Sequence, residues 1–528
     1  MKKLIALAAV VVVVAGGCTS DPDDPKRGDG GGAGAGPAGV LRVLAGSELQ
    51  DLEPMLEEVR QATGVQVKLT YTGTLDGVER VYTGVAARDT DAIWFSSNRY
   101  LELHGDAIDK ISTQTKVMSS PVILGVRSAQ AAELGWDKRR PTWKEIAEAG
   151  ASGRFTYGMT NPAASNSGFS ALVAAASALA DAGTAITGDQ VRQVGPQLTA
   201  FFKGQAFAAG SSGWLADAFK QRTDVSGLIN YESVLLSLKA QGVDITLVHP
   251  SDGVVTADYP LTLLAGVPTD VRDRYQRVVD YLRRDDVQRK IVERTNRRPV
   301  VAAAAPADRF VGPLVELPFP VRLDVADALV GAYLNTLRRA PRTLYVLDLS
   351  GSMAGDRIEK LKAAMTALTG ADTSLSGRFS RFSNREQVLL VPFGTRPNAV
   401  QRYEVPAENP EAELNRIRGA VQALKVGGDT AIYDALATAY DEARKLIAAD
   451  PSRFTTIVLL TDGVRTAGRD LNAFTSTVGN PKIPVFPVLF GESVVAEMNE
   501  VARVTGGRVF DGRSGSLQEV FKEIRGYQ

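Results

Sequence analysis

The stretch LYVLDLSGSM, residues 344–353, decides the fold of the second half of the chain. Four apolar residues make a buried-strand pattern that ends at Asp348, and Ser350 and Ser352 follow at alternate positions. Because alternate residues of an extended chain share one side, these three oxygen-bearing side chains can face one point. In a parallel α/β sheet that point lies beyond the carboxyl end of the strand, where ligands bind.

Two later segments end in oxygen donors as well. Thr430 closes a glycine-rich turn before a helix predicted over 431–448, and Asp462 follows an apolar strand predicted over 454–460. With the first three residues they complete the pattern Asp-x-Ser-x-Ser, then Thr, then Asp. Taken singly, each residue fits an ordinary turn or helix cap. That interpretation does not account for the five together.

The pattern resembles the metal-ion-dependent adhesion site of von Willebrand factor type A domains. The resemblance covers 341–528 and implies a doubly wound α/β domain. It implies that the cofactor is Mg²⁺ (or Mn²⁺/Ca²⁺) and that a partner protein completes the coordination with an acidic residue. Oxygen ligands suit such hard cations. The implied ligands are Asp348, Ser350, Ser352, Thr430 and Asp462.

Upstream, residues 40–306 alternate short apolar strands with amphipathic helices, which is typical of a parallel α/β sheet. A strand over 40–45 and another over 91–95 each end in a turn that contains Ser or Asn. Since ligands of such sheets bind beyond the carboxyl ends of strands, these turns are candidate contact points. The residues concerned are Ser47, Ser96 and Asn98.

A serine-rich turn precedes an apolar helix predicted over 169–180. The free N–H groups of a helix start, with the hydroxyls of Ser165 and Ser167, could hold an anion. Plain N-capping by either serine is the commoner use of such residues. Tyr231 opens another predicted helix. The order of these pieces resembles class II extracellular solute-binding proteins, and among them the binders of phosphate, sulfate or molybdate.

This second resemblance implies two α/β lobes that close on a solute like a hinge. Lobe one would run from 40 to about 124 and from about 244 to 306, with lobe two between. No basic residue stands in the candidate turns, so a peptide or a sugar remains as open as an oxyanion. Residues 307–340 are predicted to be a linker and connecting helix. The candidate solute contacts are Ser47, Ser96, Asn98, Ser165, Ser167 and Tyr231.

The first residues are predicted to be a targeting signal and not part of a folded domain. Lys2 and Lys3 precede a short apolar run, and small residues stand directly before Cys18, the single cysteine. This resembles a bacterial lipoprotein signal, which implies removal of 1–17 and lipidation of Cys18; an ordinary signal peptide is the alternative. Residues 18–39, rich in Gly and Ala, are predicted to be a flexible tether. The expected location is therefore extracytoplasmic, anchored to the bacterial membrane by lipid.

Composition narrows the class of protein further. Lys and Arg number 60, as do Asp and Glu, which argues against nucleic acid as a partner. One cysteine excludes an intrachain disulfide. The chain contains no phosphate-binding P-loop, no His-Glu-x-x-His and no Gly-x-Ser-x-Gly, so an enzyme is not expected. His104 and His249 are expected to be ordinary histidines.

The hypothesis is a surface-anchored lipoprotein with two binding activities. The first domain would bind a solute or peptide, and the second would bind a partner protein through the metal. One alternative is the solute receptor of an ABC importer, with a phosphate- or molybdate-like oxyanion as solute. A lesser alternative is a hydrolase that uses the metal as a Lewis acid.

Overall fold

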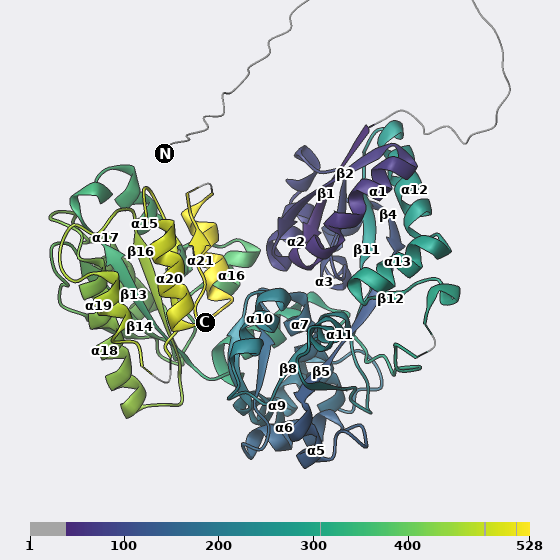
Figure 1. Cartoon of the computed structure of the whole chain (residues 1–528), viewed down its shortest axis with the longest axis horizontal. Helices are drawn as coiled ribbons and strands as arrows, with labels where there is room; N and C mark the ends of the chain where they lie inside the picture. Colours follow the sequence, from purple (N-terminus) through teal and green to yellow (C-terminus); the bar gives the residue numbers. More distant parts are fainter. Residues whose placement is uncertain (1–38, 307, 480–481, 514) are drawn as a thin grey trace, which may run out of the picture.

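The computed structural model describes residues 39–306, 308–479, 482–513 and 515–528. It contains three β-sheets with helices on their faces, which confirms the α/β class (Figure 1). Two sheets form the lobes of the first domain, and the third forms the second domain. The predicted signal sequence, Cys18 and nearly all of the predicted tether lie outside the described residues.

Lobe one is built on a five-stranded sheet in the order β2-β1-β3-β11-β4. β1 runs parallel to β2 and β3, and β11 runs antiparallel to β3 and β4. The helices α1 and α12 pack against each other and against β1 and β2. The elements are β1 (Gly39–Gly46), η1 (Ser47–Leu52), α1 (Glu53–Thr63), β2 (Val65–Thr72), α2 (Thr74–Tyr82), η2 (Ala86–Arg88), β3 (Ala92–Trp94), α3 (Arg99–Glu102), α4 (Gly105–Ile108), β4 (Ile111–Lys116), β11 (Pro260–Leu264), α12 (Thr269–Leu282) and α13 (Asp285–Thr295).

Lobe two is built on the sheet β10-β5-β8-β6-β7, with β9 and β12 also paired to β5. Its central helix α7 is buried along nearly its whole length, as the uninterrupted apolar and small residues of its sequence require. The elements are β5 (Met118–Arg127), α5 (Ser128–Leu134), α6 (Trp143–Ala151), β6 (Tyr157–Thr160), α7 (Asn166–Leu179), α8 (Gly188–Gln193), α9 (Gly195–Lys203), β7 (Gln205–Ala209), α10 (Ser212–Gln221), β8 (Gly227–Tyr231), α11 (Glu232–Ala240), β9 (Ile245–Val248), β10 (Thr256–Ala257) and β12 (Arg298–Pro299).

The boundaries expected for the lobes, near 124 and 244, are wrong. β5 pairs antiparallel with β8 and β9, so both 118–127 and 245–248 belong to lobe two. The chain crosses between the lobes at Val117, again between Ala257 and Pro260, and a third time between α13 and β12, so the expected placement of everything from 244 to 306 in lobe one is also wrong. An apolar run predicts a strand, but its partner is decided by tertiary packing, so the sequence alone could not assign 118–127 and 245–248 to the correct lobe.

The second domain follows a connecting segment. Here α14 (Leu323–Ala332) continues into a π-helical turn, Tyr333–Leu337. These two elements correspond to the predicted connecting helix. α14 packs against α7 and α8 of lobe two. A short 3₁₀ turn, η3 (Ala302–Ala304), precedes this segment and packs on α13.

The sheet of the second domain has the order β15-β14-β13-β16-β17-β18 and is parallel except for β15. Alternate residues of β13 face two separate apolar cores, with α15, α17 and α21 on one side and α18, α19 and α20 on the other. The elements are β13 (Pro341–Asp348), η5 (Gly351–Met353), α15 (Asp356–Thr366), the π-helical turn Ala367–Ala371, α16 (Leu375–Ser380), β14 (Gln387–Phe393), β15 (Gln401–Glu404), α17 (Glu411–Gln422), α18 (Ile432–Ala449), β16 (Phe454–Thr461), α19 (Leu471–Thr475), β17 (Val485–Leu489), α20 (Val495–Thr505), β18 (Phe510–Asp511) and α21 (Leu517–Arg525).

The second domain packs against both lobes. In Figure 1, α21 and the C-terminus lie between the sheet of the second domain and α10 of lobe two, while α16 points toward lobe one. α16 packs against α2 of lobe one, and Ser376 donates hydrogen bonds from its amide and hydroxyl to Glu79 Oε2. None of the helices in the described ranges has the length and apolar character that a membrane span requires.

Candidate functional site

Asp348 lies at the carboxyl end of the central strand β13, beside the end of β16. Its Oδ1 accepts a hydrogen bond from the amide of Ser350 at 2.8 Å, and its Oδ2 accepts one from the hydroxyl of Thr461 at 2.7 Å. The carboxyl group is fully buried, and this burial raises its pKa. A buried carboxylate held by two donors is fixed in place but lacks a compensating charge.

Two serine hydroxyls link Asp348 to the second carboxylate. Ser350 Oγ and Ser352 Oγ lie 3.0 Å apart, and Ser352 Oγ donates to Asp462 Oδ1 at 2.8 Å. Asp462 is also buried, and its Oδ2 accepts a hydrogen bond from Arg357 Nη1 at 2.5 Å. The structure therefore brings four of the five predicted metal ligands into one hydrogen-bonded cluster.

Thr430 lies on the neighbouring loop. The backbone joins the two loops, since the amide of Gly351 donates to the carbonyl of Gly428 at 2.9 Å and that of Gly427 to Leu349 at 2.7 Å. Thr430 is nearly buried, and its amide donates to Thr466 Oγ1 at 2.9 Å. Its side chain makes no hydrogen bond to the other four predicted ligands among the described residues.

The donor set suits a hard divalent cation, because it contains two carboxylates and three hydroxyls and no softer atom. Within the described ranges, no group of three or more His, Cys, Asp and Glu gathers in a way that could hold a metal. Binding would therefore depend on the hydroxyls. The sequence did not point to Arg357, which occupies one oxygen of Asp462, or to Thr461, whose hydroxyl holds Asp348.

In the first domain, Tyr231 lies where the two lobes meet. Its hydroxyl accepts a hydrogen bond from Asn166 Nδ2 of lobe two at 3.1 Å, and its ring centroid lies 6.1 Å from that of Tyr259, which directly precedes β11 of lobe one. The ring is fully buried, and burial raises the pKa of the hydroxyl well above its usual value. Tyr231 is therefore a buried residue of the lobe interface and does not line the cavity described below.

The other predicted solute contacts fall into two groups. Asn98 lies inside lobe one, where its Nδ2 donates to Gln114 and Thr262 at 2.7 and 2.8 Å. Ser167 lies at the centre of a buried hydroxyl cluster in lobe two. Its Oγ is 2.8 Å from the hydroxyls of both Thr160 and Ser212 and 3.2 Å from that of Ser165. Ser165 stands at the N-cap position of α7 but makes no capping hydrogen bond.

A cavity of about 420 Å³ lies at the mouth between the lobes. Of the six predicted solute contacts, Ser47 and Ser165 line it, and the other four do not. The sequence did not predict that the second domain supplies part of the wall. The residues from that domain are Ser376, Ser380, Gly515, Ser516, Glu519, Val520, Lys522, Glu523 and Tyr527.

The C-terminal segment seals one side of this cavity against lobe two. The Tyr527 ring packs edge-on against Trp214, with the ring centroids 4.9 Å apart. A Cβ on Gly210 would lie 2.4 Å from that ring, so only glycine fits there. Asn161 Nδ2 donates to the carbonyl of Arg525 at 3.2 Å. The second domain therefore contacts lobe two at the entrance to the cleft.

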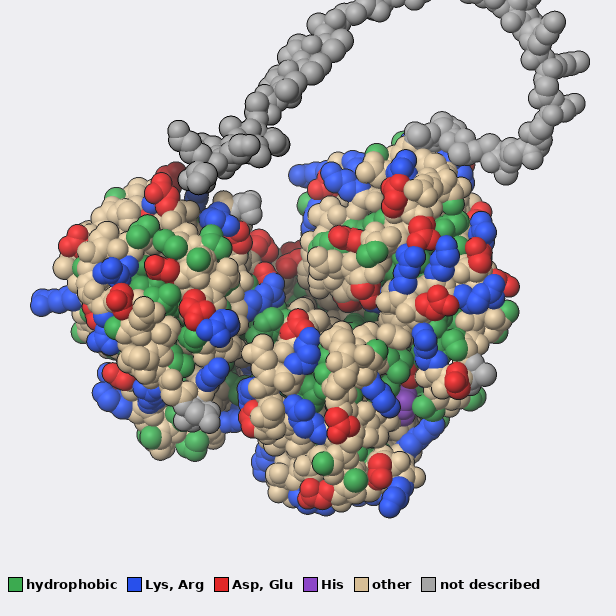
Figure 2. Space-filling model, in the orientation of Figure 1, with side chains coloured by type: hydrophobic (Ala, Val, Ile, Leu, Met, Phe, Trp, Pro, Cys, Tyr) green, Lys and Arg blue, Asp and Glu red, His purple; other side chains and the backbone are tan. Residues whose placement is uncertain are grey.

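Acidic side chains dominate the lining of the cavity. Glu48 and Asp76 come from lobe one and Glu519 and Glu523 from α21, against the single amine of Lys522. Burial, with the charge of Asp76 nearby, raises the pKa of Glu519. In Figure 2, acidic side chains gather in the hollow between the second domain at the left and lobe one at the upper right. This surface attracts cations more than oxyanions.

Comparison with known proteins agrees with these two folds. Residues 41–294 match the family model of bacterial extracellular solute-binding proteins, and residues 343–464 match that of the von Willebrand factor type A domain. The chain therefore carries a bacterial extracellular solute-binding domain followed by a von Willebrand factor type A domain. No curated protein gives a significant match.

Solved structures similar to the chain include periplasmic binding proteins. AfuA from Actinobacillus pleuropneumoniae, with fructose-6-phosphate bound, is 12% identical with a TM-score of 0.45, and the match covers 57% of this chain and 98% of that one. The sulfate-binding protein SubI from Mycobacterium tuberculosis H37Rv is 19% identical with a TM-score of 0.41, covering 55% and 96%. Iron-bound HitA from Pseudomonas aeruginosa is 12% identical with a TM-score of 0.44, covering 56% and 98%.

Proposed function

We propose that the protein is an extracytoplasmic lipoprotein, anchored through Cys18, with two binding activities. The first domain binds a small solute or peptide between its lobes. The second binds a partner protein through a divalent metal. The observation that supports this combination best is the cavity at the cleft mouth, because both lobes and α21 of the second domain line it. A solute held there would touch both domains at once.

Asp348, Ser350, Ser352, Thr430 and Asp462 would hold the metal, which we propose to be Mg²⁺ (or Mn²⁺/Ca²⁺). Bound there, it would supply a positive charge that accepts an acidic side chain from the partner. Arg357 pairs with Asp462 at 2.5 Å and is about one-third exposed, so it can turn toward solvent when a cation takes its place. The buried Asp348 would gain the compensating charge that it lacks.

The charges of the cavity support one class of solute over another. Four carboxylates and one amine line it, so we propose a neutral or cationic solute, such as a peptide with basic side chains. The importer alternative with an oxyanion as solute has no such support in the cavity. The hydrolase alternative has no support from the residues around the candidate metal ligands. In the described ranges, no histidine and no third carboxylate hydrogen-bonds to those ligands.

A pull-down tests the proposal directly. The lipid-free chain, lacking residues 1–18, is immobilised and exposed to envelope proteins with Mg²⁺ or with EDTA. We expect a partner that is retained only with Mg²⁺, and that is lost from the Asp348→Ala variant. Thermal shift assays with basic and acidic peptides test the cleft. No Mg²⁺-dependent partner together with no ligand-induced shift would contradict the proposal.

A further inference from the structure

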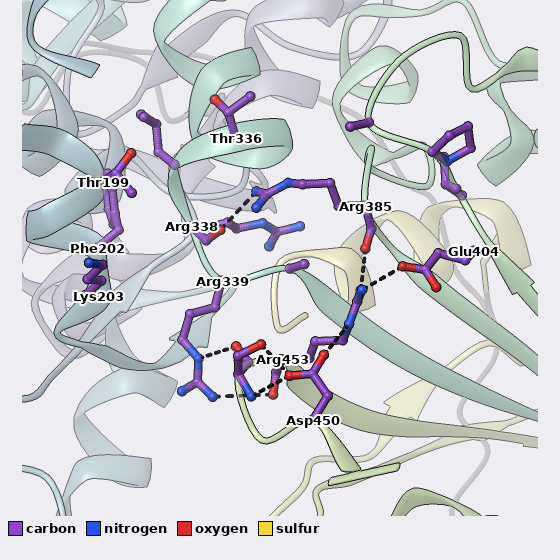
Figure 3. Close-up of a pocket in the computed structure, with 16 residues that line it drawn as sticks. Thr199, Phe202, Lys203, Thr336, Arg338, Arg339, Arg385, Glu404, Asp450 and Arg453 are labelled. Atoms are coloured by element: carbon purple, nitrogen blue, oxygen red, sulfur yellow. Dashed lines mark hydrogen bonds and ion pairs between the residues drawn. The ribbon is translucent and has the colours of Figure 1, made fainter. Parts of the chain in front are cut away.

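A second cavity, of about 620 Å³, lies on a different part of the molecule, where the two domains join (Figure 3). One wall is α9 of lobe two, with Thr199, Phe202 and Lys203. Another is the end of the π-helical turn and the linker that follows it, residues 336–340. The third is the base of the second domain, including Arg385 and the turn around Arg453. It shares no lining residue with the cavity at the cleft mouth.

The lining carries a marked excess of positive charge. Two acidic and five basic side chains line the cavity, and a single arginine, Arg453, hydrogen-bonds to both acids. Arg453 donates to Asp450 Oδ2 at 3.0 Å and to Glu404 Oε1 at 2.7 Å. Arg338 donates to the main-chain O of Gln528 and to Ser383 Oγ. The other three bases, Lys203, Arg339 and Arg385, have no carboxylate within 4.0 Å among the described residues.

Two of these arginines lie against backbone carbonyls instead. Arg339 donates from Nε to Ser452 O at 2.7 Å and from Nη2 to Pro451 O at 2.6 Å. Arg385 donates from Nε to Asn335 O at 2.8 Å and from Nη2 to Arg338 O at 3.1 Å. These bonds fix both guanidinium groups in place but neutralise neither charge.

Each fixed guanidinium keeps an unused donor. Nη1 of Arg339 and Nη1 of Arg385 have no hydrogen-bond partner in the described part of the chain, and neither has Nζ of Lys203. Figure 3 shows Lys203 on the α9 side of the cavity, with Arg339 and Arg385 across from it. Three cationic donors from three walls therefore border one open space.

The environment makes these charges costly. Burial lowers the pKa of Arg339 below its ordinary value, with some compensation from Asp450. Burial also lowers the pKa of Arg385, and the nearby charge of Arg453 adds to the effect. A multivalent anion would supply the missing countercharge, and guanidinium groups match the oxygens of phosphate in geometry.

We propose that this junction cavity binds a multivalent oxyanion of the phosphate class, held by Lys203, Arg339 and Arg385. Its volume leaves room for a group larger than inorganic phosphate, such as a phosphorylated small molecule. Because the donors come from both domains, the bound anion ties lobe two to the second domain. This site is independent of the solute cleft and of the candidate metal site.

The test uses inorganic pyrophosphate as the probe and the full lipid-free chain. Titration is followed by calorimetry and by thermal unfolding, with NaCl adjusted to constant ionic strength because general charge effects are screened by salt. The variant is Lys203→Gln, since Lys203 is exposed and its loss leaves the packing intact. The matched control is Lys138→Gln, an exposed lysine of the same lobe outside the cavity.

We expect pyrophosphate to raise the Tm of the parent and of Lys138→Gln alike. Lys203→Gln should bind about tenfold more weakly, the effect of losing one charge-assisted hydrogen bond. A double variant that adds Arg339→Gln should lose the shift. Two results would overturn the proposal: no pyrophosphate binding by the parent, or binding that Lys203→Gln and the double variant leave unchanged. Neither result bears on the cleft or on Mg²⁺.

Discussion

Asp348 is the residue on which the candidate metal site depends. Its strand is buried at every position, so the apolar neighbours maintain the fold without it. We expect Asp348→Ala to fold and to lose Mg²⁺-induced stabilisation, which for the parent at a hundredfold excess over Kd is about 2.7 kcal/mol. Thermal unfolding with Mg²⁺ and with EDTA measures this. Asp429→Ala is the control, because Asp429 is an exposed acid beside Thr430. A metal response that survives in Asp348→Ala would refute the site.

Glu232 supports a second residue-scale prediction, on pH. This buried carboxylate accepts hydrogen bonds from Arg298 at 2.6 and 2.8 Å, and its Oε1 lies 2.8 Å from His249 Nε2. Burial alone would raise its pKa, but the bonds from Arg298 and His249 outweigh it, so the pKa is lowered. The ionised Glu232 with its partners thus stabilises the fold at pH values above the ordinary pKa of a glutamate, about 4.3. That stability is lost as pH falls through the lower folded value.

Glu232→Gln should remove this acid-dependent part of the stability and cost about 3 kcal/mol at neutral pH, because the half-buried Arg298 would lose its charged partner. Urea unfolding between pH 3 and pH 7 measures both effects. The control is Glu58→Gln, which removes a half-buried surface carboxylate paired with Lys290 and Arg294 and should change less than Glu232→Gln. Parallel pH profiles for the parent and Glu232→Gln would contradict the assignment.

At the scale of elements, the sequence predicted the strands that deliver the metal ligands because their signals are local. An apolar run with Asp, Ser and Ser at alternate positions marks both β13 and its carboxyl end. The strand partners of β5 and the contact between α21 and lobe two are not local. They depend on residues such as Trp214 and Tyr527, more than 300 positions apart, meeting in space. Nothing in either segment alone could show it.

The seal that α21 makes at the cleft mouth gives a third prediction. Tyr527 is buried between Trp214 and Gly210, so Tyr527→Ala leaves a cavity and should cost about 3 kcal/mol in docking of the second domain. Small-angle scattering and crosslinking between the domains should report a looser arrangement. Gly210→Val should do the same from the other side. The control is Tyr71→Ala, because Tyr71 lines the same cavity from lobe one. Unchanged scattering in both Tyr527→Ala and Gly210→Val would disprove the role of this contact in docking.

At the scale of the molecule, the cavity at the cleft mouth is lined by some of the predicted solute contacts and not by others. Ser96 and Tyr231 do not line it, and the buried hydroxyl of Tyr231 accepts a hydrogen bond from Asn166. Ser47 and Ser165 do reach the cavity, as strand ends and helix starts of α/β sheets do. The acidic residues of α21 that line the cavity belong to the second domain. The sequence did not predict them as solute contacts, because they reach the cavity only when the two domains pack together.

The last prediction concerns coupling between the two binding activities. A solute in the cleft-mouth cavity would touch α21, because α21 residues line it, and α21 packs on the same face of the sheet as α15, whose Arg357 pairs with Asp462. Solute binding and metal-dependent partner binding should therefore change each other's affinity by the same factor, because such coupling is reciprocal. Glu519→Gln should weaken binding of a basic peptide, although Glu519 lies outside the solute-binding domain. Calorimetry of the peptide with and without Mg²⁺ and partner measures the factor in both directions. Equal affinities under all conditions would show that binding in one domain does not affect binding in the other.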